Sequence, residues 1–275
     1  MIEPNGIARE AECEISICIV IFKPDRVVLE RTLVSLRNAL ARLSPRLARL
    51  YIVDNSAELS DHDWLREMLR GLTYEIIAGH GNVGFGSANN MVLDRIGKFH
   101  LVLNPDVEME PEALEHGLAF MLDNPDCGLS TPEAFNPDGS KQYLCKRYPA
   151  VFDLLLRGFA PSWVRDYFCD RLQRYEMRDQ AADIVGWDPP IVSGCFMLFR
   201  GDVFRKLNGF DPRYFLYFED FDVSLRTGKV SRIAYVPAIR IVHGGGNAAR
   251  KGPWHIWQFA RSAAIFYSTY PLKFF

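Results

Sequence analysis

The strongest constraint on the fold is a regular alternation of strand-like and helix-like segments through the first half of the chain. Residues 15–22 form a β-branched apolar run typical of a central strand, and residues 26–43 repeat apolar side chains at helical spacing. Strands are expected next at 50–53, 74–78 and 99–104, and helices at 61–69, 87–96 and 111–122. This alternation predicts an α/β fold with a mostly parallel, doubly wound sheet and helices on both faces.

Composition argues against several other classes of protein. The 275 residues are 48% hydrophobic and 24% charged, as in an ordinary globular domain, and a formal net charge of −2 offers no basic face for nucleic acid. The longest apolar run is too short to span a bilayer, and the acidic start has no signal-peptide pattern. Reduced, buried thiols in a cytoplasmic protein are expected, because the six cysteines form no CxxC pair. They are Cys13, Cys18, Cys127, Cys145, Cys169 and Cys195.

The run Asn104-Pro105-Asp106 follows the predicted strand at 99–104. Pro105 cannot donate a ladder hydrogen bond, so the strand must end before it. Asp106 is then presented at the carboxyl edge of the sheet, which is where open α/β sheets bind ligands. Taken alone, the same three residues also fit a plain turn.

A glycine-rich stretch from Gly79 to Gly84 fits the GxGxxG pattern of dinucleotide-binding folds, with Asp106 about twenty residues further on. An oxidoreductase that uses a nicotinamide or flavin cofactor is therefore an alternative. Two strand–helix units precede the stretch, however, and the first strand is followed by Lys23-Pro24-Asp25 without glycine. A turn that needs positive φ angles is a third reading.

The second half of the chain is less regular. Residues 135–140 predict a turn at a hairpin tip, and residues 191–199 predict a buried strand that contains Ser193-Gly194-Cys195. Residues 165–183 are dense in charge with interleaved aromatics, which fits either a solvated helix face or a cover over the site.

Three acids, Glu219, Asp220 and Asp222, open a predicted helix at 219–227, and aromatic residues flank them. Acids at a helix N-terminus commonly complement the dipole. Three acids among aromatics fit better with a partly buried carboxylate whose pKa is tuned for general-base catalysis. Strands are predicted at 233–236 and 239–242, and they lead to His243 and three glycines. That histidine is placed either as a core residue or to meet a ligand or metal.

Eight short motifs occur in a characteristic order along the chain. They are residues 17–22, 52–56, 81–86, 103–106, 192–194, 209–211, 219–222 with 225–226, and 242–243. Together they resemble the family 2 inverting glycosyltransferases of the GT-A fold, and within that family the rhamnosyltransferase-like branch. The resemblance extends from about residue 14 to about residue 270.

The resemblance implies a UDP- or dTDP-linked sugar as the donor and Mg²⁺ or Mn²⁺ as the cofactor. Asp106 corresponds to the last acid of the metal-binding DxD motif, and His243 to a further metal ligand. Asn104 takes the place of the first acid of that motif, and a neutral amide binds a cation more weakly than a carboxylate does. Asp220 corresponds to the general base, with Glu219 beside it. The residues expected to bind the nucleotide sugar are Phe22, Asp54, Asn82, Gly84, Asn104 and Asp106.

One GT-A domain is expected to span residues 1–275, with a nucleotide-sugar half at about 14–130 and an acceptor half at about 131–250. A C-terminal aromatic helix is predicted from Trp254 to Ser268, with Trp257, Ala260 and Ala264 packed on the domain. Its remaining aromatics lie beside cations (Arg250, Lys251, Arg261 and Lys273), which suits a membrane interface. The resemblance implies a glycan or polyprenyl-diphosphate-linked acceptor in O-antigen-like synthesis, at the inner face of the cell membrane. A non-catalytic protein that binds sugar nucleotides is a further alternative.

Overall fold

The sheet begins with four parallel strands, and their order differs from the order in the sequence. A computed structural model describes residues 14–43, 48–56, 62–179, 183–245 and 252–275. The spatial order is β3 (Tyr74–Ile77), β2 (Ala48–Asp54), β1 (Ile15–Ile21) and β4 (Phe99–Leu103). Parallel pairing of β1 with both β2 and β4 buries β1 completely, which explains its unbroken apolar sequence.

The same sheet continues through β11 (Phe196–Arg200), β6 (Cys127–Phe135), β12 (Arg232–His243) and β5 (Val107–Met109). Here β11 is antiparallel to both of its neighbours, β6 is parallel to β12, and β5 is antiparallel to β12. The short strand β7 (Lys141–Gln142) pairs with β6, and the short strand β9 (Gly186–Trp187) pairs with β12. A separate pair is formed by β8 (Cys145–Lys146) and β10 (Ile191–Val192). The predicted α/β sheet is confirmed, with antiparallel strands added in its second half.

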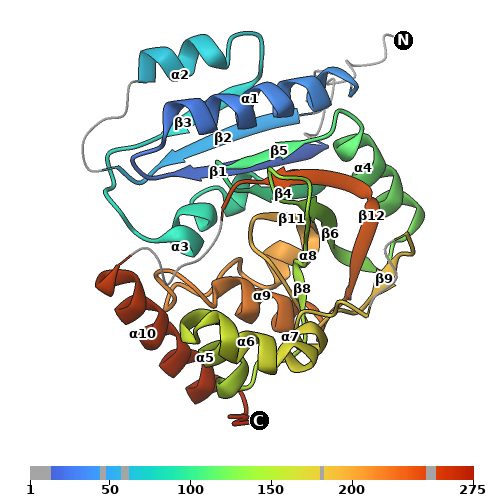
Figure 1. Ribbon diagram of the computed structural model, residues 1–275. Helices are drawn as coiled ribbons and strands as arrows, with labels where there is room; N and C mark the ends of the chain where they lie inside the picture. The colour runs from blue at the N-terminus through green and yellow to red at the C-terminus, as the bar shows by residue number, and fades with distance from the viewer. Residues whose placement is uncertain (1–13, 44–47, 57–61, 180–182, 246–251) are drawn as a thin grey trace, which may run out of the picture.

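Helices cover both faces of the sheet, as predicted (Figure 1). One face packs on α1 (Arg26–Ala41), α2 (His62–Met68) and α4 (Ala113–Asp123), and the other on α3 (Phe85–Asn90), α8 (Gly201–Lys206) and α9 (Glu219–Thr227). A third, smaller core lies below α9 in the figure. Side chains of α5 (Val151–Phe159), α7 (Cys169–Tyr175), α9 and α10 (Pro253–Thr269) contribute to it, and the short helix α6 (Ser162–Tyr167) connects α5 to α7.

Three predicted segments differ from the structure. The helix expected at 87–96 is divided into α3 and a 3₁₀ turn, Leu93–Arg95. The strand expected at 191–199 is divided between β10 and β11, because Ser193-Gly194-Cys195 carries the chain from one sheet to the other. The two strands expected before His243 form the single strand β12, which bends at a register shift between Val236 and Arg240. The hairpin predicted at 135–140 is confirmed, since β6 pairs with β7 across it.

The C-terminal helix α10 is present, but it packs through a different face from the one predicted. Gln258, Ser262 and Phe266 are buried, whereas Trp257, Ala260 and Ala264 are exposed. The prediction failed because small and aromatic residues alternate around this helix, so the sequence does not mark one apolar stripe. Arg250 and Lys251 lie outside the described residues. No helix in the described parts of the chain combines the length and hydrophobicity needed to cross a bilayer.

The prediction of buried thiols is largely correct. Among the five cysteines within the described residues, all unbonded, four are buried and Cys169 is exposed. Burial raises the pKa of Cys127, Cys145 and Cys195 to about 12, so these thiols stay protonated and act as small apolar side chains. Cys13 lies outside the described residues.

Candidate active site

Asp106 and His243 meet at the carboxyl edge of the sheet, as their positions after β4 and at the end of β12 suggested. Because β12 pairs antiparallel with β5 and His243 lies opposite Val107, the imidazole comes beside the preceding aspartate. Nε2 of His243 is 3.5 Å from Oδ1 of Asp106. The structure thus brings together the two side chains that were predicted as metal ligands.

Gln142 fixes the tautomer of His243. Its Nε2 donates to the His243 carbonyl oxygen at 2.8 Å and to Oδ1 of Asn136 at 2.5 Å, which defines the orientation of the amide. Oε1 of Gln142 therefore faces Nδ1 of His243, 3.0 Å away, and because an amide oxygen only accepts, Nδ1 carries the proton. The other ring nitrogen, Nε2, is turned toward Asp106. Metal-binding histidines are commonly oriented by a hydrogen bond of this kind.

Gly245 keeps the space beside this pair open. A Cβ at that position would lie 2.6 Å from both Oδ2 of Asp106 and Nε2 of His243. Carboxylate oxygen suits Mg²⁺ and Mn²⁺, whereas an imidazole nitrogen favours Mn²⁺ over Mg²⁺. Among the described residues, no group of three or more His, Cys, Asp or Glu side chains could hold a metal ion. A cation held here would therefore complete its coordination with substrate phosphate and water.

A cavity of about 750 Å³ opens above this edge, and we call it the edge cavity. Its volume is in the range of cavities that bind small molecules. It is walled by the ends of β1 and β4, by the turn before α3, and by Phe215, Trp254 and His255. Five of the residues predicted to bind the nucleotide sugar line it, namely Phe22, Asn82, Gly84, Asn104 and Asp106.

Asp54 is the one predicted nucleotide-binding residue that lies behind the wall of this cavity. It ends β2 and is almost fully buried. One carboxylate oxygen accepts the Ser56 backbone N–H at 2.9 Å, and the other lies 3.0 Å from Nε2 of His62. The neighbouring Asn55 lines the cavity and donates to the Gly84 carbonyl oxygen at 3.2 Å. Asp54 therefore holds the loop after β2 in place next to the cavity.

The glycine-rich stretch has a steric role. Gly84 has a φ of 88°, and a Cβ there would lie 2.4 Å from the carbonyl oxygen of Phe215. Phe85 donates its N–H to that same oxygen at 3.1 Å, so the turn is joined to the loop that leads to α9. The strand before the stretch is the edge strand β3, whereas the dinucleotide pattern follows the first strand of its domain. The oxidoreductase alternative is not supported.

The acidic cluster divides into two kinds of carboxylate. Glu219 and Asp220 begin α9 after Tyr217 and Phe218, whose φ angles of 69° and 67° are left-handed. Such angles cost free energy in residues other than glycine and are found preferentially at functional sites. Burial raises the pKa of both carboxyls, and their mutual repulsion raises that of Glu219 further. A carboxylate with a raised pKa is suited to accept a proton.

Asp222, the third acid, has a structural role. Its side chain is buried and bonds Nε of Arg226 at 2.7 Å and the hydroxyl of Tyr270 at 2.7 Å. Arg226 also donates to the carbonyl oxygens of Leu207 and Gly209. This network holds α9 against α10 and against the loop before it.

The turn at residues 193–195 joins the two groups of site residues. Asp220 accepts the Gly194 N–H through Oδ2 at 3.1 Å, and Asn104 donates its N–H to the Cys195 carbonyl oxygen at 2.8 Å. The segment after β4 leads to Asp106, and it contacts Cys195 of this turn. The helix α9, which bears Asp220, contacts the neighbouring residue Gly194. That proximity explains why the sequence between β10 and β11 contains glycine, because a Cβ at Gly194 would lie 3.3 Å from Asp220.

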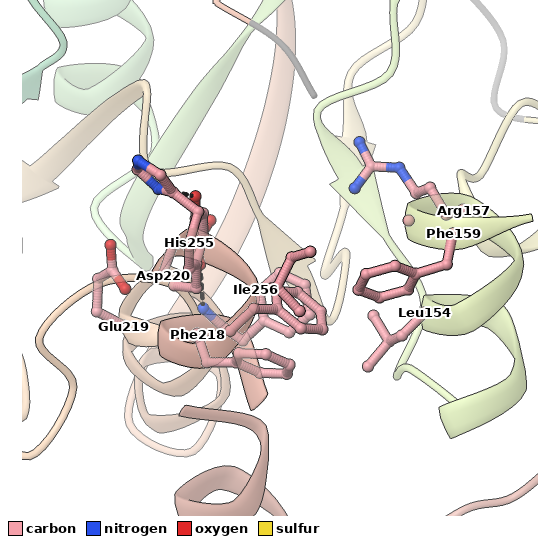
Figure 2. Close-up of a pocket in the computed structure, with 12 residues that line it drawn as sticks. Leu154, Arg157, Phe159, Phe218, Glu219, Asp220, His255 and Ile256 are labelled. Carbon is pink, nitrogen blue, oxygen red and sulfur yellow. Dashed lines mark hydrogen bonds between the residues drawn. The ribbon is translucent and has the colours of Figure 1, made fainter. Parts of the chain in front are cut away.

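A second cavity, of about 260 Å³, lies between α5, α9 and α10, and we call it the helical cavity. Figure 2 shows Glu219, Asp220 and His255 on one side of it and Leu154, Arg157 and Phe159 of α5 on the other. His255 also lines the edge cavity, so the two cavities adjoin at this residue. A ligand in the edge cavity and a second one in the helical cavity, whose wall includes Asp220, could therefore meet at His255.

Sequence reasoning missed three residues of this site. Gln142 and Arg157 lie in stretches without a recognisable motif, and His255 was counted only as part of the terminal helix. Several buried polar side-chain atoms have no hydrogen-bond partner among the described residues, and two of them lie in α9 and α7. They are Glu219 Oε2 and Tyr175 Oη. Only the first of these lines the helical cavity.

The mixed, mostly parallel sheet with helices on both faces has the architecture of the GT-A glycosyltransferases. The chain belongs to glycosyl transferase family 2, whose family model matches residues 16–207.

Two relatives give the sequence comparison. One is the N-acetylglucosaminyl-diphospho-decaprenol L-rhamnosyltransferase of Mycobacterium tuberculosis (strains CDC 1551 / Oshkosh and H37Rv). It is 28% identical over 257 residues, which cover 86% of this chain and 79% of the relative. The other is the rhamnosyltransferase WbbL of Escherichia coli (strain K12). It is 28% identical over 184 residues, which cover 63% of this chain and 64% of WbbL.

Solved structures agree on the fold. GalNAc-T7, crystallised with UDP, GalNAc and Mn²⁺, superposes with a TM-score of 0.63 at 16% identity, over 88% of this chain and 45% of that one. Residues 1–349 of TarS from S. aureus superpose with a TM-score of 0.55 at 13% identity, over 95% of this chain and 67% of that one. The predicted GT-A fold and family are therefore confirmed.

Proposed function

We propose that this glycosyltransferase moves a sugar, rhamnose in the first instance, from a UDP- or dTDP-linked donor to a glycan on a polyprenyl diphosphate, with inversion at the anomeric carbon. The observation that carries the proposal is the junction of the two cavities at His255, with Asp220 in the wall of the helical cavity. The relatives are a rhamnosyltransferase named for a diphospho-decaprenol-linked sugar and a second rhamnosyltransferase. Residues at about 14–130 would serve the donor, and residues at about 131–250 the acceptor, in the synthesis of a surface polysaccharide.

Asp220 is the general base of this proposal. Its Oδ2 is held by the Gly194 N–H, which orients the carboxylate at the wall of the helical cavity. An acceptor hydroxyl in that cavity gives its proton to Asp220 as its oxygen attacks the anomeric carbon from the side opposite the diphosphate. Inversion follows from this single displacement, and no covalent enzyme intermediate is needed. Glu219, protonated through burial and the charge of Asp220, can donate a hydrogen bond to the acceptor.

Asp106 and His243 are the proposed metal ligands. Gln142 orients the histidine and Gly245 leaves the space open, so the residues present fit a divalent cation, Mn²⁺ better than Mg²⁺. When bound, such a cation neutralises charge that develops on the departing diphosphate. Phe22, Asn82, Gly84 and Asn104 line the cavity that the nucleotide would enter, and Asp54 supports the loop behind it.

We also propose that the protein binds reversibly to the inner face of the cell membrane. The residues that support this are exposed aromatics on α10 and the tail after it. The side chains of Trp254, Trp257, Phe274 and Phe275 are 48%, 59%, 62% and 82% exposed. Arg261 and Lys273 lie on the same helix and tail, and cations beside aromatics suit an anionic lipid surface. Phe266 is buried and does not belong to this surface.

The test is a panel of nucleotide sugars with Mn²⁺ or Mg²⁺, read out as nucleoside diphosphate released in the presence of a lipid-linked acceptor. We expect release with one UDP- or dTDP-sugar and a higher melting temperature in its presence. Stabilisation by a nucleotide sugar without any release would indicate a non-catalytic binding protein. Stabilisation by NAD(P) or a flavin alone would contradict the proposal.

A further inference from the structure

We infer that Arg157 on α5 binds the diphosphate of the acceptor, and that the apolar wall of the helical cavity beside it receives the first units of the attached lipid. The inference rests on the proposed function and assigns a part of the acceptor to a part of this cavity.

Arg157 is the cation that faces the proposed base across the cavity (Figure 2). Its side chain is 53% exposed, and its Nε lies 3.3 Å from Oε1 of Glu176. Within the described residues this is the hydrogen bond that Arg157 makes, so its two terminal amino groups are available to a ligand. An arginine presented in this way can bind phosphate oxygens in a bidentate manner.

The surroundings of Arg157 carry more positive than negative charge. Glu176 is shared between Arg157 and Arg178, and Arg178 makes two bonds to it, at 2.9 and 2.6 Å. The buried Lys146 adds a further amine, whose pKa burial and the charge of Arg157 lower to about 7. Two arginines thus share the Glu176 carboxylate, so an anion that entered beside Arg157 would meet a guanidinium whose charge is only partly offset.

Apolar side chains form most of the remaining wall. Those that the argument uses are Leu154, Phe159, Phe218, Ile256 and Phe259. The rings of Phe159 and Phe259 are 6.4 Å apart, so the walls of α5 and α10 approach each other there. The polar groups of the cavity (Glu219, Asp220 and His255) lie together at its other side. In Figure 2 the carboxylates lie on one side of the cavity, Arg157 lies on the other, and apolar side chains form the wall between them. The cavity therefore offers one kind of contact for each part of an acceptor made of a sugar, a diphosphate and a lipid.

Arg157 is an unsuitable partner for the diphosphate of the donor. That diphosphate is expected at Asp106, which lines the edge cavity and lies 3.5 Å from His243, whereas Arg157 is not part of the edge cavity's lining. The two diphosphates of the reaction would therefore occupy different cavities, one on each side of Asp220.

The experiment compares Arg157→Gln with Arg178→Gln, because both variants remove a cation from Glu176 but only Arg157 lines the cavity. Transfer is measured to two acceptors with the same sugar: N-acetylglucosaminyl diphospho-farnesol and octyl N-acetylglucosaminide. We expect Arg157→Gln to raise KM about tenfold or more for the diphosphate acceptor, the usual effect of losing a charged hydrogen bond. Its kcat, its donor affinity and its KM for the octyl glycoside should match wild type. Arg178→Gln should match wild type with both acceptors, and Arg157→Lys should recover part of the loss.

A binding assay gives a readout that does not need turnover. Farnesyl diphosphate should quench tryptophan fluorescence in the wild-type protein, with an affinity that falls about tenfold in Arg157→Gln, and farnesol should bind both proteins equally weakly. An equal rise in KM for both acceptors, an unchanged KM for both, or a loss of donor affinity would overturn the assignment of Arg157. Transfer by the wild-type protein to neither acceptor would overturn the proposed function, and this inference with it.

Discussion

At the scale of single residues, the site depends on how buried groups are partnered. Asp220 and Asp222 are two positions apart in one helix, yet the first faces the cavity and the second is held by Arg226 and Tyr270. Chemically identical side chains therefore have different roles, and substitution of each should have a different effect.

Asp220→Asn should reduce kcat by ~10²–10⁴, because the amide keeps the shape of the carboxylate but cannot accept a proton. Donor affinity should be retained, and so should the melting temperature. Asp222→Asn is the matched comparison, and it should lower the melting temperature because it weakens a buried ion pair. Steady-state kinetics and thermal unfolding of both variants check this. Near-normal turnover in Asp220→Asn would show that Asp220 is not the general base.

Glu219→Gln should stabilise the protein increasingly as the pH rises. The folded-state pKa of Glu219 is raised, so its favourable contribution is complete below the ordinary value of 4.5 and is lost as the pH rises through the folded pKa. Glutamine cannot ionise and so avoids this loss. Melting temperatures of variant and wild type should differ more at alkaline than at acidic pH. Glu30→Gln, on the exposed face of α1, is the control. A difference that shrinks with rising pH would contradict the expectation.

Asp106→Ala should abolish metal-dependent binding of UDP or dTDP, because it removes the only full charge of Asn104-Pro105-Asp106. His243→Ala should weaken binding less. Gln142→Leu, which touches no ligand, should weaken it roughly 10–100-fold by releasing the His243 tautomer. Calorimetry with and without Mn²⁺ measures all three. Unchanged metal-dependent affinity in Asp106→Ala would show that no metal ion binds at Asp106.

At the scale of elements, the site depends on loops that hold neighbouring elements at short range. The turn before α3 contacts the loop before α9 at Gly84 and Phe215, and Gly209 packs against the side chain of Asn90. The position of Asp220 is therefore coupled to glycines that are far from it in the sequence.

Gly84→Ala and Gly79→Ala separate this packing effect from backbone strain. Both glycines have a φ of 88°, so each substitution costs roughly 1–2 kcal/mol of conformational strain. Gly79 has nothing within 4 Å of a Cβ, whereas at Gly84 the Cβ would collide with Phe215. Gly84→Ala should therefore unfold at a lower temperature than Gly79→Ala and also lose turnover. Equal melting temperatures and equal turnover would show that the contact is unimportant.

At the scale of the whole molecule, the C-terminal tail lies at the opposite end from α1 and α2 (Figure 1). Figure 1 shows α10, α5 and the C-terminus at the lower end, and α1 at the top. The tail is joined to α5 through its backbone, since the N–H groups of Val151 and Phe152 donate to the carbonyl oxygens of Lys273 and Phe274.

Substitution of Phe274 and Phe275 by serine should lower binding to anionic liposomes while keeping those backbone bonds. Each aromatic ring contributes buried apolar area at the lipid interface, so its removal weakens association. Co-sedimentation measures the bound fraction, and Val34→Ser on the exposed face of α1 is the control. If the wild-type protein ignores anionic liposomes, the aromatics serve a contact with another protein instead.

The sequence by itself determined the class of fold and the family, and it predicted most of the candidate site residues. These follow from local features: the apolar run of β1, the proline after Asn104, and acids placed at the start of α9. Such features act within a few residues, so they can be read along the chain.

Only the tertiary structure decided which residues meet. His243 reaches Asp106 because β12 returns antiparallel beside β5, and Asp220 reaches the sheet edge through the turn at Gly194. Gln142 and Arg157 are positioned in the site by contacts between residues far apart in the sequence. Such contacts also decide which face of α10 is buried. These contacts join residues far apart in sequence, and their free energy depends on the whole arrangement of strands and helices. No local pattern carries that information.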